Sequence, residues 1–485
     1  MSSDTPKKLS SKKVENIIFC VCLFLFQVVM IILYSVWVRY DKDSNHDPLP
    51  NGESPVQEEV DNLYGYFRDV NIMIFFGFGF LMVFLRRYGY SSLGYTFLIS
   101  AMVAQWSVLV WGFYDSMLEH KELREYYYFT MESLLNGLFC AGSVMISYGA
   151  LLGKVTPLQM LFMGIVEPVL FFLNMYIMER LHAFDVGGGM TIHLFGAYYG
   201  LSVCWFLTNS KAKHSKENAA SYSGDLFAMA GTLFLWMMWP SFNAAIAPRG
   251  HPQMRALANT FLSLTGSTIA TFIVSRLFSH YGYKLDMVHV QNSTLAGGVV
   301  QGVMAHLNVN PGPAISMGFI IGSVSVLGYI FLTPFLARRF NIQDTCGIHN
   351  LHGMPGLVGS IAAVIAAAHA INNPDLYSAA EFKVLFPAGD DQAKRNAAMT
   401  FIALAVGIIG GIISGFCMKQ IGKIGKLTKE EYFSDHAFWV VASDYPKEFE
   451  GVDPHQYIHD EENGVEMDQA EKRDESMPTT SDHQQ

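Results

Sequence analysis

The stretch Asp185-Val-Gly-Gly-Gly-Met-Thr-Ile-His193 is polar and glycine-rich, and it lies where the surrounding sequence is otherwise apolar. A second stretch, Asp344-Thr-Cys-Gly-Ile-His-Asn-Leu-His352, has the same spacing of Asp, Gly and His. Both therefore follow the pattern D-x-x-G-x-x-x-x-H. Two copies of one polar motif in an apolar chain indicate a pseudo-symmetric site to which both halves of the chain contribute.

The composition around these stretches is typical of a helical membrane protein. Hydrophobic residues make up 51% and charged residues 15% of the 485 residues, and long apolar runs recur from Ile17 to Met418. A helix needs about 20 apolar residues to cross a bilayer, and the runs have about that length. The sequence therefore predicts an all-α polytopic membrane protein with about 12 transmembrane helices, and it is unlike that of a soluble enzyme.

The apolar runs also define the domain organisation. Spans are predicted at residues 17–38, 70–85, 94–113, 128–150, 155–177, 185–207, 224–247, 256–278, 287–307, 314–335, 346–371 and 398–418. They separate a leader (1–16), a transmembrane domain (17–419) and an acidic tail (420–485), whose composition predicts that it is mostly disordered. The first run has no small-residue cleavage site before Arg39, so we predict a retained span and not a signal peptide.

Charge predicts the orientation. Because the number of predicted spans is even, both termini lie on one side of the membrane. The basic leader, the lysines within residues 211–216 and the pair Arg338 and Arg339 fall on that side, and basic loops mark the cytoplasmic face. Residues 430–485 hold 16 acidic and 3 basic side chains, which accounts for the net charge of −10. We expect cytoplasmic N- and C-termini, with a docking segment at 432–445.

The two motif histidines are open to three interpretations. A polar side chain in the bilayer core is costly, so it is usually buried in the bundle or lines an aqueous path. His193 and His352 could form structural hydrogen bonds between helices, or ligate a haem or a metal ion, or face each other as neutral imidazoles across a narrow permeation path. The third interpretation is favoured because the surrounding glycines let helices approach closely. Accordingly no metal and no cofactor is expected.

The two motif aspartates have two compatible roles. Asp185 and Asp344 each precede a predicted helix, where a carboxylate accepts hydrogen bonds from free N–H groups and complements the helix dipole. The same carboxylates could take part directly in recruiting a cation. The sequence favours capping and leaves recruitment open.

Four longer motifs resemble the Rh branch of the ammonium transporter/Rh glycoprotein family. They are G-G-M-T-I-H-L-F-G-A-Y-Y-G-L-S-V from Gly188, W-P-S-F-N-A-A-I from Trp239, Q-N-S-T-L-A-G-G-V from Gln291 and C-G-I-H-N-L-H-G-M-P-G from Cys346. The resemblance covers about residues 15 to 420 and leaves the tail unassigned. It implies two inverted-topology halves, a homotrimer with a pore in each subunit, and the plasma membrane as the location.

The resemblance also implies a function and a set of site residues. His193 and His352 match the twin pore histidines, Asp185 and Asp344 match the acidic residues that precede them, and Phe139 and Phe242 match the paired phenylalanines over the outer pore. The implied function is a channel for ammonia and not an enzyme. Ammonium would be recruited at the mouth, lose its proton and cross as ammonia. Carriage of carbon dioxide, and the alternative of a non-transporting ammonium sensor or assembly subunit, stay open. The implied partners are ammonium and the lipid bilayer, with no nucleic acid and with unknown tail partners.

The sequence departs from the family pattern in two places. Met175 stands after Asn174, where Rh glycoproteins tend to have an acidic residue, so attraction of a cation to the outer vestibule would depend on Glu179 or Glu167. The first predicted extracellular loop lacks the glycosylation sequon of the vertebrate glycoproteins. Both features predict a divergent Rh member, while retention of both histidines distinguishes the chain from the blood-group Rh subunits.

Overall fold

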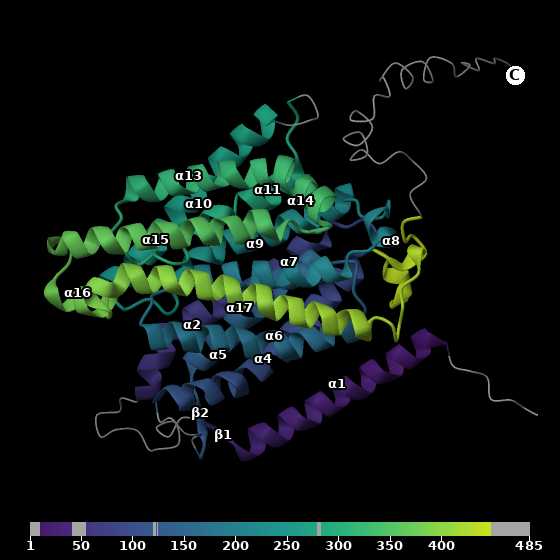
Figure 1. Ribbon diagram of the computed structural model, residues 1–485, viewed down its shortest axis with the longest axis horizontal. Helices are drawn as coiled ribbons and strands as arrows, with labels where there is room; N and C mark the ends of the chain where they lie inside the picture. The colour runs from purple at the N-terminus through teal and green to yellow at the C-terminus, as the bar shows by residue number, and fades with distance from the viewer. Residues whose placement is uncertain (1–9, 41–54, 120–122, 124, 279–282, 448–485) are drawn as a thin grey trace, which may run out of the picture. The chain divides into compact units, whose positions relative to one another are not determined.

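A computed structural model describes residues 10–40, 55–119, 123, 125–278 and 283–447 (Figure 1). The chain divides into two compact units, Met1–Ser443 and Asp444–Gln485, and the helices and strands of the described residues belong to the first. Of the predicted acidic tail, residues 448–485 lie outside the described part of the chain.

Helices make up most of the described residues of the first unit. The α-helices are α1 (Ser11–Val36), α2 (Pro55–Ile72), α3 (Gly79–Leu81), α4 (Gly89–Glu119), α5 (Met131–Leu151), α6 (Pro157–Leu181), α7 (Phe195–Leu207), α8 (Ser210–Lys213), α9 (Tyr222–Ala244), α10 (His251–Phe278), α11 (Met287–Ser293), α12 (Ala296–Gln301), α13 (Pro311–Leu327), α14 (Thr333–Phe340), α15 (Met354–Asn372), α16 (Ala379–Leu385) and α17 (Gln392–Ile421). Four π-helical segments continue the long helices, namely η2 (Met73–Phe78), η4 (Gly189–Leu194), η5 (Gly328–Leu332) and η6 (His349–Gly353). Short 3-10 turns are η3 (Met82–Phe84), η7 (Pro374–Leu376), η8 (Gly389–Asp391), η9 (Lys429–Glu431) and η10 (Asp435–Ala437).

Each of the 12 predicted spans contains helix, and ten helices in the described residues are long and apolar enough to cross a membrane. The two spans outside these ten are α9 and residues 287–307. The second of these is broken between α11 and α12, because Thr294 and Leu295 form a turn between two short helices.

Local sequence explains where the helices begin. Thr156 caps α6 in a capping box with Gln159, and Pro157 occupies the first helical position, where the lack of an N–H has no cost. The helix ends at His182, which adopts the left-handed conformation. The first helix begins at Ser11, six residues before the predicted span, because Ser10 caps it by accepting a hydrogen bond from the Lys13 N–H.

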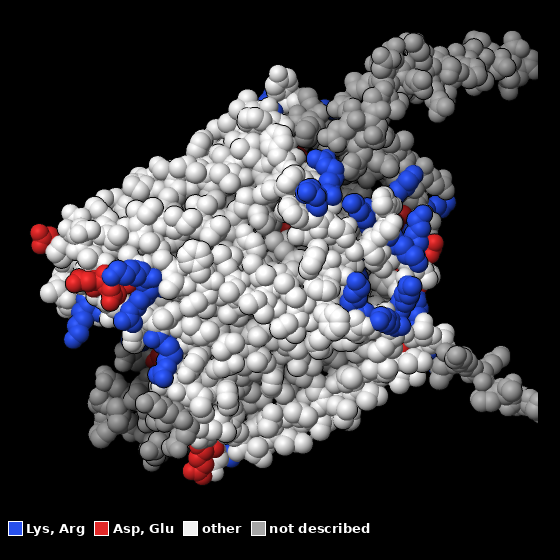
Figure 2. All heavy atoms as spheres, in the orientation of Figure 1, with Lys and Arg blue, Asp and Glu red and all other residues white. Residues whose placement is uncertain are grey.

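Charged side chains gather at the two ends of the helix bundle. Figure 2 shows Lys and Arg crowded at one end, both signs at the other, and a broad uncharged band between them. The basic residues that the structure describes include Lys211 and Lys213 of α8 and Arg338 and Arg339 of α14. A band free of charge has the character of a surface that faces hydrocarbon.

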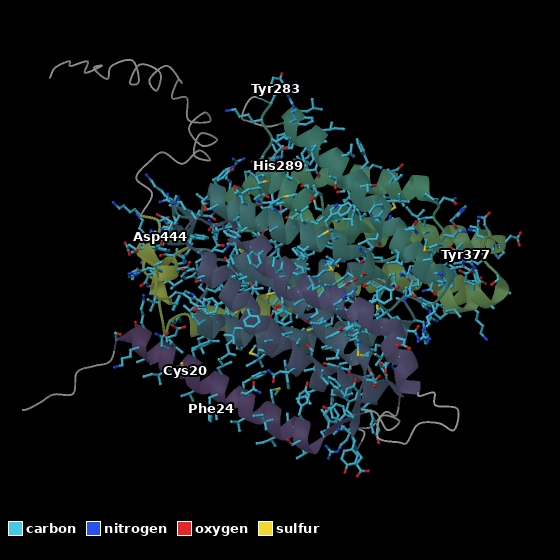
Figure 3. All side chains as sticks on the ribbon, turned by 180° about the vertical axis from the view of Figure 1, so that it is seen from behind. Cys20, Phe24, Tyr283, His289, Tyr377 and Asp444 are labelled. Carbon is cyan, nitrogen blue, oxygen red and sulfur yellow. The ribbon has the colours of Figure 1, made fainter. Side chains whose placement is uncertain are left out.

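Helix α1 lies on the outside of the bundle. Its side chains Cys20 and Phe24 point away from the other helices, and Phe24 is 68% exposed (Figure 3). Polar groups on α1 nevertheless contact the bundle. Glu15 is buried, and its carboxylate accepts a hydrogen bond from the Leu158 N–H at the start of α6 over 3.3 Å. After α1, the strand β1 (Val38–Tyr40) pairs in parallel with β2 (Tyr127–Phe129), a small sheet that the all-α prediction did not include.

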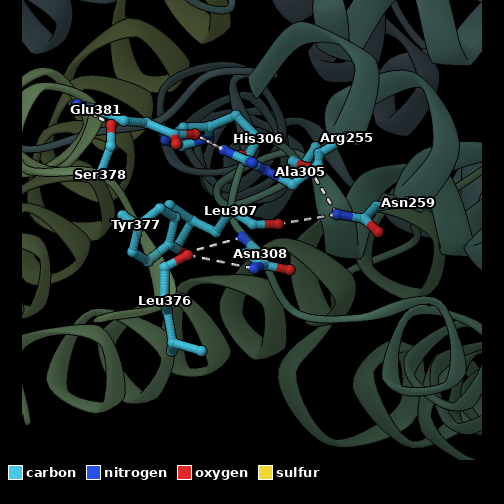
Figure 4. A network of polar contacts seen from close by, with 10 residues as sticks. All are labelled: Arg255, Asn259, Ala305, His306, Leu307, Asn308, Leu376, Tyr377, Ser378 and Glu381. Carbon is cyan, nitrogen blue, oxygen red and sulfur yellow. Dashed lines mark hydrogen bonds and ion pairs between the residues drawn. The ribbon is translucent and has the colours of Figure 1, made fainter. Parts of the chain in front are cut away.

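A polar network joins the irregular segment that follows α12, residues 302–310, to α10 and α16 (Figure 4). Asn259 donates to the carbonyls of Ala305 and Leu307 over 2.9 and 3.1 Å. Arg255 donates to the His306 carbonyl over 2.9 Å and forms an ion pair with Glu381. These bonds satisfy backbone carbonyls that no helix ladder reaches, which is the condition for irregular backbone inside a membrane protein.

Residues 428–439, here called the C-terminal clamp, pack against the basic end of the bundle. Asp435 accepts hydrogen bonds from the N–H groups of Tyr90 and Ser91 over 2.9 and 2.7 Å, and so caps the first turn of α4. Asn209 donates to the Tyr432 hydroxyl over 2.8 Å, and Lys12 pairs with Glu431. The clamp therefore ties α1, α4 and the start of α8 together, and it contains residues 432–439 of the docking segment expected at 432–445.

Candidate functional site

The site is built around the two motif histidines, which the structure brings into direct contact. Nδ1 of His193 lies 3.1 Å from Nδ1 of His352. The two imidazole rings are nearly parallel, with an interplanar angle of 7° and centroids 5.2 Å apart. Both side chains are buried. Because two nitrogens at hydrogen-bond distance need one proton between them, one ring donates and the other accepts.

The motif glycines explain how the chain reaches this arrangement. Gly188 and Gly347 stand at the same position of the two motifs, five residues before each histidine, and both have positive φ angles, 68° and 71°. A Cβ atom at Gly188 would overlap the side chain of Ile192, and one at Gly347 would overlap the ring of Tyr329. Only glycine fits this conformation without strain, so each motif turns the chain into its pore-side helix in the same way.

The motif aspartates hold the turns that follow. Asp185 accepts hydrogen bonds from the N–H groups of Met190 and Thr191 and from the Thr191 hydroxyl, over 2.8 to 3.1 Å. Asp344 accepts from the N–H groups of Ile348 and His349 over 3.0 and 2.9 Å. This is the geometry of a helix cap, and it places both carboxylates where they orient the turns that carry the histidines.

The two aspartates lie at opposite ends of the site. Next to Asp344, the Gln343 carbonyl accepts hydrogen bonds from the Lys154 ammonium and the Cys204 thiol, the latter over 3.0 Å, at the basic end of the bundle. Burial raises the pKa of Asp344 above its usual range, while its backbone hydrogen bonds and the charge of Lys154 act in the opposite direction. Asp185 lies beyond the C-terminal end of α6, at the other end of the bundle.

Aromatic rings enclose the histidine pair on the side of Asp185. Phe139 of α5 and Phe242 of α9 are buried and meet edge to face, with ring centroids 4.8 Å apart. The Phe242 ring is 6.0 Å from the His193 ring. The structure therefore brings together both phenylalanines and both histidines that the resemblance had singled out.

Two further rings at the site were not predicted. Trp239 stacks on His193, with centroids 5.6 Å apart and an angle of 24°, and Phe78 stacks on His352, with centroids 6.3 Å apart and an angle of 25°. Trp239 opens the quoted W-P-S-F-N motif, one helical turn before Phe242, so its position could have been noticed. Phe78 is one of 36 phenylalanines and carries no local signal.

Carboxylates from four helices gather at the Asp185 end. Glu132 of α5 is close enough to three other carboxylates to be repelled by them. They are Asp115 of α4, Glu179 of α6 and Glu59 of α2. Glu132 lies two helical turns before Phe139 on the same helix. Of the two glutamates considered as substitutes for an acidic residue at Met175, Glu179 belongs to this group, whereas Glu167 is buried elsewhere in the bundle.

The arrangement suits a small neutral guest better than a cofactor. Among the described residues, no group of three or more His, Cys, Asp or Glu side chains is placed to hold a metal ion. The walls are aromatic rings, and the polar atoms that face one another are imidazole nitrogens, each able to donate or accept a hydrogen bond.

Fold and site together define a polytopic membrane protein whose two halves contribute matching helices to one buried histidine pair. A family model described as Ammonium Transporter Family matches residues 28–442, and the chain belongs to that family. It is 61% identical to Rhesus-like glycoprotein B of Dictyostelium discoideum over 466 residues, covering 93% of this chain and 78% of the relative. It is 44% identical to ammonium transporter Rh type C of Canis lupus familiaris over 437 residues, covering 86% of this chain and 92% of the relative.

Solved structures share the fold. The Rh50 protein of Nitrosomonas europaea, described as belonging to the Rhesus protein family of channels, superposes with a TM-score of 0.67 at 27% identity, covering 87% of this chain and all of that one. Mep2 of Saccharomyces cerevisiae superposes with a TM-score of 0.60 at 17% identity, covering 81% and 94%. The Mep2 match supports the fold alone. The Rh-branch resemblance read from the motifs is confirmed.

Proposed function

We propose that the protein conducts ammonia across a membrane, through a path that passes Phe139 and Phe242 and then the His193–His352 pair. The observation that carries the proposal is the histidine pair itself: two buried imidazoles whose Nδ1 atoms lie at hydrogen-bond distance, enclosed by aromatic rings. Membership in a family of ammonium transporters and the names of its Rh-type relatives support the same substrate.

Energetics favour the neutral molecule as the species that crosses. Moving an ion into a low-dielectric lumen costs tens of kcal/mol in the idealised limit and still several after relaxation. Ammonium has a pKa of roughly 9, between the values of an α-amino group and of lysine, so removing its proton at pH 7 costs only about 3 kcal/mol. Deprotonation at the mouth is therefore the cheaper route, and ammonia is reprotonated on the far side.

The charge distribution supports an assignment of the two mouths. The carboxylates around Glu132 and Glu179 would concentrate ammonium at the Asp185 end, close to Phe139, because a cleft lined by one sign of charge attracts the opposite ion. The Asp344 end carries the basic side chains of α8 and α14, which is the character of a cytoplasmic face. We therefore assign the Asp185 end to the outside, with both termini in the cytoplasm. The plasma membrane as the location rests on the resemblance to the Rh branch.

We further propose a homotrimer in which every subunit has its own pore. All of the pore residues named above come from one chain, so a single copy can form the complete path. Trimeric assembly rests on the resemblance to the Rh branch. A detergent-corrected mass of one or two copies would contradict it.

The test of the proposed function is flux through purified protein in proteoliposomes. An inward ammonia gradient should alkalinise the vesicle interior faster than in protein-free vesicles, in stopped-flow records with a trapped pH dye. A non-transporting sensor or assembly subunit would bind ammonium without adding to the flux. Protein-free rates in vesicles that demonstrably contain folded protein would refute conduction. Replacing the ammonia gradient with carbon dioxide tests the second gas in the same apparatus.

A further inference from the structure

Glu167 is an acidic residue in the middle of a membrane-spanning helix, outside the site described above. It lies on α6 and is completely buried. One of its carboxyl oxygens, Oε1, is 2.6 Å from the Ser147 hydroxyl of α5. The same hydroxyl is 2.8 Å from the carbonyl oxygen of Gly196 on α7. A single serine therefore bridges a buried acid on one helix and a backbone carbonyl on another.

Counting protons at this bridge fixes the direction of the hydrogen bonds. A serine hydroxyl has one hydrogen to donate and two lone pairs to accept with. The Gly196 carbonyl can only accept, so the Ser147 hydrogen must point to it for that contact to be a hydrogen bond. The contact with Glu167 then needs a hydrogen from the carboxyl group. Both short contacts are satisfied together only when Glu167 is a neutral carboxylic acid that donates to Ser147.

The surroundings of Glu167 also disfavour its ionised form. Its second oxygen, Oε2, is buried without a hydrogen-bond partner, and no cation pairs with Glu167 in the part of the chain that the structure describes. The titratable groups that interact with it electrostatically are Cys140 of α5 and Tyr199 of α7. A buried carboxylate needs paired charge or several donors, and this one has neither.

The bridge lies at a close approach of α5 and α7. A Cβ atom at Gly196 would come within 2.8 Å of the Ser143 hydroxyl, and one at Gly200 within 2.6 Å of the Cα of Ser147. The Ser143 hydroxyl donates in addition to the Ile192 carbonyl over 3.4 Å. Two serines, one turn apart on α5, thus contact two carbonyls one turn apart on the chain segment that carries His193.

This contact joins the two parts of the site. Phe139 lies on α5 two turns before Ser147, and His193 lies three residues before Gly196. The spacing between α5 and α7 therefore sets where the Phe139 ring lies relative to the His193 ring. A side chain that fixes the direction of the Ser147 hydrogen bond acts on the pore without touching what passes through it.

We propose that Glu167 is permanently protonated and serves as a positioning residue: it donates to Ser147, Ser147 donates to Gly196, and this chain of two hydrogen bonds holds the phenylalanine-bearing helix against the histidine-bearing one. Its effect on transport rests on the proposed ammonia conduction, whereas its protonation state does not.

Infrared spectroscopy of the full-length protein in lipid tests the protonation state directly. A neutral carboxylic acid gives a carbonyl band above the amide region that an ionised carboxylate lacks. The wild-type protein should keep such a band at pH 8, and Glu167→Gln should remove it. Glu179→Gln, a matched loss of a glutamate near the end of the same helix, should leave it. Absence of a band that depends on Glu167 overturns the proposal.

Flux measurements test the positioning role. Glu167→Gln retains an N–H donor toward Ser147 and should conduct ammonia within about twofold of the wild type. Glu167→Leu has a similar volume without a donor, and Ser147→Ala breaks the same chain at its centre, so both should conduct severalfold less. Equal losses in the Gln and Leu variants, or wild-type flux in the Leu and Ala variants, would overturn the role.

The outcomes separate the two proposals. If the wild-type protein shows the Glu167 band and no ammonia flux, the proposed function fails and the neutral acid stands. If it conducts ammonia and lacks the band, the inference fails alone. Should Glu167→Gln not fold, Ser147→Ala keeps the test decisive, because loss of the hydrogen-bond acceptor must shift the acid band to higher frequency.

Discussion

The ring of Phe433 lies against the backbone of Gly153, and the Phe433 N–H donates to the Gly153 carbonyl over 2.9 Å. A Cβ atom at position 153 would overlap this ring, and the ring is completely buried. The C-terminal clamp is thus inserted into the loop that joins α5 to α6. A segment beyond the last membrane helix thereby contacts the loop at the end of the helix that carries Phe139.

The first prediction concerns the stability of this contact. Phe433→Ala removes a buried ring, and such truncations cost about 3 kcal/mol or more of unfolding free energy. We expect a clear fall in the midpoint of thermal unfolding of the detergent-solubilised protein. Val440→Ala is the control, because Val440 is 97% exposed. Equal midpoints for the two variants would show that the clamp does not stabilise the fold.

The second prediction separates the clamp from the rest of the tail. A chain that ends at residue 450 keeps all of the clamp and should retain wild-type ammonia flux per molecule at the surface. A chain that ends at Leu427 lacks the clamp, leaves the first turn of α4 without the Asp435 cap, and should unfold at lower temperature. Loss of flux per surface-expressed molecule in the longer chain would contradict a modular tail.

The third prediction concerns the paired glycines. Gly188→Ala and Gly347→Ala place a side chain in the left-handed region, which costs about 1–2 kcal/mol before any steric overlap. Because both positions also lack space for a Cβ atom, we expect each variant to lower the midpoint of thermal unfolding. The matched control is Gly312→Ala on α13, where nothing lies within 4 Å of the added atom. A shift no larger than that of Gly312→Ala would remove the conformational argument.

The part of the site that the sequence predicted is the part held by interactions between residues close together in the chain. The pattern D-x-x-G-x-x-x-x-H is local: the aspartate accepts hydrogen bonds from groups four to six residues further along the chain, and the glycine turns the chain between them. Its repetition therefore predicted two matching turns and the pairing of His193 with His352. The widened π-helical turns around both histidines were not predicted, because a change of helix type over five or six residues leaves little trace in hydropathy.

Contacts between helices that are far apart in the sequence could not be predicted, because they produce no local sequence pattern. Phe78 stacks on His352 from a helix far away in the sequence, and nothing in its neighbours distinguishes it from a lipid-facing phenylalanine. Glu167 was considered as an acid of the outer vestibule, whereas the structure buries it against Ser147, because position along a helix does not reveal which neighbour a side chain faces.

The last prediction concerns the twin histidines. The two rings share one proton in a single hydrogen bond between their Nδ1 atoms, so replacing either ring leaves the other unpaired in an aromatic lumen. We expect His193→Ala and His352→Ala each to lower ammonia flux or to change what passes, while the protein still folds. Folding should survive because an interhelical polar contact in a membrane contributes on average only about 0.6 kcal/mol. Stopped-flow alkalinisation of proteoliposomes measures the flux, and His251→Ala, on the exposed first residue of α10, is the control.

Replacing a histidine with aspartate is the sharper form of this test. The difficulty for a cation in the lumen is the loss of its hydration without any compensating charge. His193→Asp or His352→Asp supplies a fixed negative charge beside the remaining imidazole, and an opposite charge a few ångströms away stabilises a cation strongly in a low dielectric. We expect ammonium-dependent electrical current in the Asp variants and none in the wild type, recorded on a supported membrane beside the alkalinisation assay. Wild-type flux in both Ala variants, with normal expression and no current in the Asp variants, would show that the pair is a structural contact between helices. If well-folded Asp variants show neither alkalinisation nor current, the path instead closes when the histidine pair is broken.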